Sequence, residues 1–70
     1  MAVKLRYSDG PTGRQFLIEV ERHFGGREQF FTFRFLDAGP PSVSDPYPFY
    51  LDAVRAALEA ARAECRKPTH

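Results

Sequence analysis

Residues 47–66, which read YPFYLDAVRAALEAARAECR, decide the fold. The apolar residues of this stretch recur at intervals of three and four, which is the pattern of one stripe along an α-helix. The stripe comprises Tyr47, Tyr50, Leu51, Val54, Leu58, Ala61 and Cys65. A second flank is made only of small residues, which would let another backbone come close: Ala53, Ala56, Ala60 and Ala63. We therefore predict an amphipathic helix.

Three segments precede the helix, at residues 2–7, 14–24 and 29–37, and each alternates apolar and polar side chains in the manner of a half-buried strand. Turn residues at 9–13 and the Gly25-Gly26 pair separate them. The fold class predicted is α+β, a three-stranded antiparallel meander packed against one C-terminal amphipathic helix in the order β-β-β-α. Residues 1–70 then form a single small domain. Phe31, Phe33 and Phe35 should face Leu51, Val54 and Leu58 of the helix.

The second and third strands can be aligned across the loop at residues 25–28. Pairing Phe24 with Gln29 brings apolar residues together on one face and opposite charges together on the other, and both arrangements favour cross-strand pairing. The register implies four further pairs: Val20 with Phe33, Ile18 with Phe35, Glu19 with Arg34, and Leu17 with Leu36. The register of the first hairpin stays open, because five turn residues allow several loop lengths.

Residues 37–48 connect the third strand to the helix and contain four prolines, which hold a chain extended. Ser44 and Asp45 are candidates for the helix N-cap, with Pro46 or Pro48 in the first turn. The third strand is expected to be an unprotected sheet edge, and such edges invite pairing with another chain.

Composition excludes several classes of protein. The formal net charge of +1 predicts no general attraction to nucleic acid or to anionic lipid. A single cysteine, Cys65, excludes an internal disulfide and a cysteine-based zinc site, and a free thiol favours the cytoplasm. No signal peptide is recognisable and no stretch approaches the ~20 apolar residues of a membrane span.

Groups for catalysis are also sparse. The histidines are His23 and His70, and Glu19 with Glu21 are better explained as ion-pair partners of the basic residues on neighbouring strands than as a catalytic pair. We expect no enzyme, no metal site, no cofactor and no small-molecule substrate.

Nucleic-acid binding is the alternative function. The element order resembles the arm-binding domains of tyrosine integrases and the plant ethylene-response DNA-binding domain, which lay the open face of a sheet in the major groove; HicB-type antitoxins have a similar order. The resemblance implies a basic open face, here Lys4, Arg6 and Arg34. Glu19 and Glu21 would make that face nearly neutral, and the Arg-Trp-Gly signatures of the DNA-binding families are absent.

The leading hypothesis is protein–protein interaction, as a small regulator, inhibitor or accessory subunit of phage-inhibitor or antitoxin type, with a homodimer as one form. The partner itself is not identified. Two groups of residues are interaction candidates. Leu17, Phe30 and Leu36 would form an apolar patch on the open sheet face, and Tyr47 with Phe49 would stand among prolines as rigid anchors or plug the end of the core.

Overall fold

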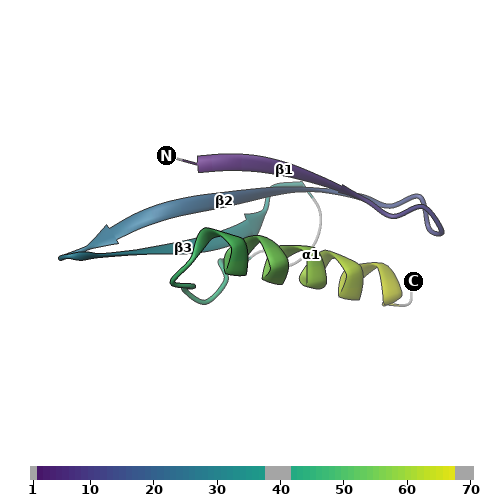
Figure 1. Ribbon diagram of the computed structural model, residues 1–70. Helices are drawn as coiled ribbons and strands as arrows, with labels where there is room; N and C mark the ends of the chain where they lie inside the picture. Colours follow the sequence, from purple (N-terminus) through teal and green to yellow (C-terminus); the bar gives the residue numbers. More distant parts are fainter. Residues whose placement is uncertain (1, 38–41, 68–70) are drawn as a thin grey trace.

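The computed structural model describes residues 2–37 and 42–67 of the 70-residue chain. Strands β1 (Ala2–Ser8), β2 (Gln15–Gly25) and β3 (Glu28–Phe35) form one antiparallel sheet in the order β1-β2-β3, and helix α1 (Tyr50–Arg66) follows. The helix lies along one face of the sheet (Figure 1). The predicted β-β-β-α fold is therefore confirmed. The predictions for Pro40, Pro41 and His70 fall outside the described residues.

The register predicted for the second hairpin is also confirmed. Phe24 lies opposite Gln29, and Val20, Ile18 and Glu19 lie opposite their expected partners on β3. The N–H of Leu36 donates to the carbonyl of Leu17 at 2.8 Å, which continues the same pairing beyond the strand end.

The first hairpin closes through a longer turn, in which Ser8 lies opposite Gln15. The Asp9 carboxylate accepts hydrogen bonds from both the N–H and the hydroxyl of Thr12, at 3.0 and 2.5 Å. Gly13 has a φ of 71°, which is readily adopted only by glycine. These features settle the register that the sequence left open, with Val3 opposite Val20 and Leu5 opposite Ile18.

The helix, however, presents a different face to the sheet than its large residues predict. Three alanines at four-residue spacing are fully buried, namely Ala53, Ala57 and Ala61. They form the core with Phe16, Ile18, Val20, Phe31 and Phe33. Val54 packs against this core, but Leu58 is half-buried outside it and Leu51 is 66% exposed. The expectation that Leu51 and Leu58 cover the sheet is wrong.

The reason is steric. The helix-facing side of the sheet is already filled by large side chains, so the helix gains the closest packing by turning its methyl groups toward the rings. Of the alanine flank predicted from sequence, Ala53 is buried and Ala56 and Ala60 pack against the core, whereas Ala63 is exposed. Large-on-small packing at this interface leaves the leucines at the side of the helix.

The helix also begins later than predicted. Its N-cap is Phe49, whose backbone is extended and which makes no side-chain capping bond, so Ser44, Asp45 and Pro46 lie outside the helix. Tyr47 is held in an extended bridge to Phe31, with each N–H donating to the other's carbonyl at 2.8 Å. Pro48 adds to this, because the residue before a proline is disfavoured in the helical conformation.

The same segment closes the outer edge of β3, contrary to the expectation of an unprotected edge. Besides the bridge at Phe31, the N–H of Ser44 donates to the carbonyl of Phe33 at 2.9 Å. The N–H of Phe33 in turn donates to Ser44 Oγ at 2.9 Å. Ser44 is therefore an edge-capping residue rather than a helix cap, and β1 supplies the sheet's other edge.

Candidate functional site

The open face of the sheet does not gather the three apolar residues predicted to form a patch there. Leu17 and Leu36 are adjacent; Leu17 is half-buried and Leu36 is 37% exposed. Phe30 lies at the far end of β3, where its ring stacks on that of His23 with the centroids 4.9 Å apart. Polar residues Thr32 and Arg34 separate it from Leu36 along the strand. The predicted patch is thus divided into two small pieces.

A hollow on this face is lined mostly by polar side chains, namely Glu19, Glu21, His23, Phe30, Thr32, Arg34 and Val43. Its groups are engaged with one another. His23 Nε2 lies 2.9 Å from the Thr32 hydroxyl and 3.5 Å from Glu21 Oε1. These contacts form a polar network that joins β2 and β3.

The basic residues proposed for nucleic-acid binding are mostly occupied. Arg34 pairs with Glu19 at 2.9 Å, as its register predicts, and Arg6 donates to the Gln15 side chain at 3.3 Å. Lys4 lies directly opposite Glu19 on β2. The three cations therefore share their face with a central carboxylate.

Tyr47 and Phe49 have different environments. Tyr47 packs against the core, and its ring stacks on Phe33 with the centroids 6.3 Å apart. Phe49 is 68% exposed. Tyr47 therefore plugs the end of the core, and Phe49 alone projects outward.

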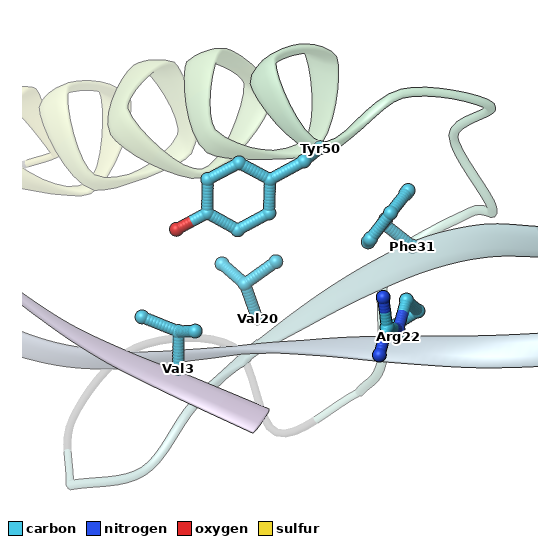
Figure 2. Close-up of a pocket in the computed structure, with 5 residues that line it drawn as sticks. All are labelled: Val3, Val20, Arg22, Phe31 and Tyr50. Carbon is cyan, nitrogen blue, oxygen red and sulfur yellow. The ribbon is translucent and has the colours of Figure 1, made fainter. Parts of the chain in front are cut away.

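An apolar hollow lies between the start of α1 and the sheet. Its lining consists of Val3, Val20, Arg22, Phe31 and Tyr50, and its volume is about 130 Å³. Figure 2 shows Val3 and Val20 directed from the sheet toward Tyr50, which reaches down from the helix. Val3 is 40% exposed, although its face of the sheet is the one that carries the core.

Another hollow lies at the other end of β1, beside the last turns of the helix. It is lined by Tyr7, Asp9, Pro11, Thr12, Arg62, Cys65 and Arg66. β1 and α1 run in the same direction (Figure 1), and these two separate hollows lie at opposite ends of β1. Half-buried Leu5 lies between them on β1. We name the two hollows and the inward face of β1 between them the β1–α1 groove.

The helix side of the groove carries the displaced leucines. Leu51, Leu58 and Cys65 are seven residues apart, and a spacing of seven places them on the same flank of a helix. Cys65 lines the hollow that also contains Tyr7 of β1, so this flank of the helix is the one on the β1 side. Leu51 and Leu58 line neither of the two hollows themselves, but they share a helix flank with Cys65, which does.

Sequence reasoning missed this groove. Alternation with Lys4 and Arg6 puts Val3, Leu5 and Tyr7 on the face opposite the predicted open face, and the helix stripe was predicted to pack on that face. The sequence did contain a relevant signal, because the alanines and the stripe of large apolar residues lie on different sides of the helix. These sides compete for contact with a single sheet. Deciding between them requires the volumes on the sheet side, which hydrophobic periodicity does not report.

Two further observations concern the described residues. Within 2–37 and 42–67, no three side chains of histidine, cysteine, aspartate or glutamate gather as a metal-binding group. Helix α1, with 17 residues, falls short of the length and apolar character needed to cross a bilayer. Comparisons of the chain with protein-family models, with curated proteins and with solved structures found no match.

Proposed function

We propose that this chain is a small non-catalytic interaction module, acting as a regulator, inhibitor or accessory subunit, and that it binds a protein partner through the β1–α1 groove. The observation that carries the proposal is the position of the leucines. Leu51 is 66% exposed on the same helix flank as Cys65, and Val3 on the sheet is 40% exposed. Exposed apolar surface on the strand and on the helix is what a partner's side chains would cover.

Energetics support the same proposal. Burying a leucine side chain fully stabilises an association by about 1.5–3 kcal/mol, and Leu51 has two thirds of its surface left to bury. A chain of 70 residues also has little core of its own, so coverage of this groove would stabilise the fold as well. The proposed setting is the cytoplasm, which suits the free thiol of Cys65.

The test compares two substitutions of the same kind. Leu51→Asp places a charge on the groove wall, and Val43→Asp places one at a similarly exposed residue of the connector, 58% exposed, which lines the hollow on the open face. Neither residue belongs to the core, so both variants should keep the thermal stability of the parent. Tagged chains are used for capture from cell extract with quantitative mass spectrometry, and purified chains for sedimentation velocity.

The expected result is a captured protein, or a self-association, that persists with Val43→Asp and is lost with Leu51→Asp. Loss with Val43→Asp alone would move the interaction to the open sheet face and refute the groove. Capture of the same proteins in all three forms would refute the groove, and a monomeric chain that captures no protein would refute the function itself.

A further inference from the structure

The outer edge of β1 borders the groove, and within residues 2–37 and 42–67 no other strand or loop pairs with its backbone. The carbonyl of Leu17 accepts from Leu36, so the backbone of Leu17 is directed toward β3. Arg6 lies opposite Leu17 across the β1–β2 ladder. Since the backbone groups of facing antiparallel residues point toward or away from each other together, Arg6 directs its N–H and carbonyl outward, and Lys4 does so two residues earlier.

A strand added at this edge would reach the groove. Neighbouring strands lie about 4.8 Å apart and direct alternate side chains to the same face. One set of side chains from an added strand would therefore lie beside Val3 and Leu5, on the face of the sheet that α1 covers over β2 and β3. Strand addition of this kind combines main-chain hydrogen bonds for affinity with pockets for alternate side chains.

The charges around this edge favour an acidic strand. On the open face, an added strand would lie next to the side chains of Lys4 and Arg6. The carboxylates of that face belong to β2, where Glu19 is paired with Arg34 and Glu21 lies 3.5 Å from His23. In the β1–α1 groove, Arg22 lines the hollow beside Tyr50. Arg62 and Arg66 line the hollow beside Cys65, where Asp9 is the single acidic residue. Cations outnumber carboxylates on both sides of the edge.

A second copy of this chain fits the edge poorly. Two β1 strands that pair antiparallel about Leu5 would set Lys4 of each copy opposite Arg6 of the other, and like charges directly opposite are destabilising. Shifting the pairing by two residues sets Lys4 against Lys4 or Arg6 against Arg6 instead. The described part of β3 cannot substitute, because its edge is closed at Phe31 and Phe33 by the connector.

From these observations we infer that β1 captures an extended segment of another protein as a fourth, antiparallel or parallel strand, and that this segment alternates acidic and apolar residues. Its acidic side chains lie along Lys4 and Arg6, and its apolar side chains fill the β1–α1 groove. The inference rests on the proposed function and specifies the partner's chemistry and its mode of binding.

The probes are synthetic peptides of seven residues, the length of β1, that alternate glutamate with valine. A peptide alternating lysine with valine tests the charge, and a glutamate–valine peptide with alternate backbone N-methyl groups tests main-chain pairing. Binding to the whole chain is followed by amide hydrogen exchange in nuclear magnetic resonance spectra. The amides of Lys4 and Arg6 should exchange more slowly when the glutamate–valine peptide is added, and neither control peptide should have this effect.

Two variants at one position separate backbone from charge. Lys4→Gln removes only the charge and should weaken binding about two- to fivefold, an effect that salt abolishes. Lys4→Pro removes the outward N–H as well, at an edge position where proline is tolerated. It should weaken binding a further three- to tenfold or so, from the net free energy of one hydrogen bond.

Each contrary outcome overturns the inference in a recognisable way. Equal binding of the N-methylated peptide would show that the groove takes side chains without strand pairing, and the proposed function would stand. Equal or tighter binding of the lysine–valine peptide would refute the acidic partner. No binding of any peptide would refute capture by β1, while the fate of Leu51→Asp still decides the proposed function. Self-association that Lys4→Pro abolishes would make the occupant a second copy.

Discussion

Replacing Ala57 with leucine should destabilise this domain strongly, because Ala57 is fully buried between the helix backbone and the sheet. Leucine adds three carbon atoms at a fully buried position, and overpacking of this kind costs about 1–3 kcal/mol. We expect the upper half of that range, since the phenylalanine rings of the same core cluster are themselves buried. For a domain of this size, about 2–3 kcal/mol lowers the melting temperature by roughly 8–24 °C.

Two comparisons make the prediction specific to the orientation of the helix. Ala63→Leu is the same substitution on an exposed position of α1, and it should change the free energy of unfolding by less than about 0.5 kcal/mol. Leu51→Ala removes a side chain that has only about one third of its surface buried. It should therefore cost less than about 1 kcal/mol, partly offset by the higher helix propensity of alanine.

Urea denaturation followed by far-ultraviolet circular dichroism measures all three variants under the same conditions. The reasoning would be refuted if Ala57→Leu were as stable as the parent chain while Leu51→Ala lost about 2–5 kcal/mol, the cost of truncating a core leucine. That result would mean that the leucine stripe, and not the alanine row, covers the sheet.

Two other predictions concern the turn and the covered edge. Hydrogen bonds from Thr12 hold the pKa of the Asp9 carboxyl below its ordinary value, so its stabilising contribution is present above about pH 4 and is lost as the pH falls through the lowered folded-state pKa. Urea unfolding should show the parent chain to be more stable than Asp9→Asn at neutral pH, and this difference should disappear at acidic pH. A difference in stability that is the same at both pH values would contradict this. Ser44→Ala leaves the N–H of Phe33 without its side-chain acceptor and should cost about 1 kcal/mol in urea denaturation. Exposed Ser42→Ala is the control, and equal effects of the two serine substitutions would argue against the edge-capping role of Ser44.

Much of the sheet could be predicted from sequence because its signals are local. Alternation assigns the faces of β2 and β3, and the turn at Gly25-Gly26 brings their partners together. Pairing Glu19 with Arg34 then follows from counting along two adjacent strands. Contacts between two strands that follow one another in the chain can be predicted without knowing how distant segments pack.

The candidate site was predicted less well, because it depends on contacts between distant segments. Tyr47 was recognised as a residue that could plug the core, and it does pack there. Phe30 was grouped with Leu36, although the length of β3 keeps them apart. Closure of the β3 edge by Ser44 required knowing the path of the connector, which the prolines restrict but do not determine.

The sequence by itself determined the element order, the register of the second hairpin and the amphipathic nature of the helix, because each follows from the spacing of residues along the chain. Tertiary structure alone decided which side of α1 meets the sheet and which sheet edge stays open. The physical reason is volume: beneath the helix the phenylalanines leave room for methyl groups and not for leucines. The row of Ala53, Ala57 and Ala61 therefore became the contact, and Leu51 was left exposed on the flank of the helix.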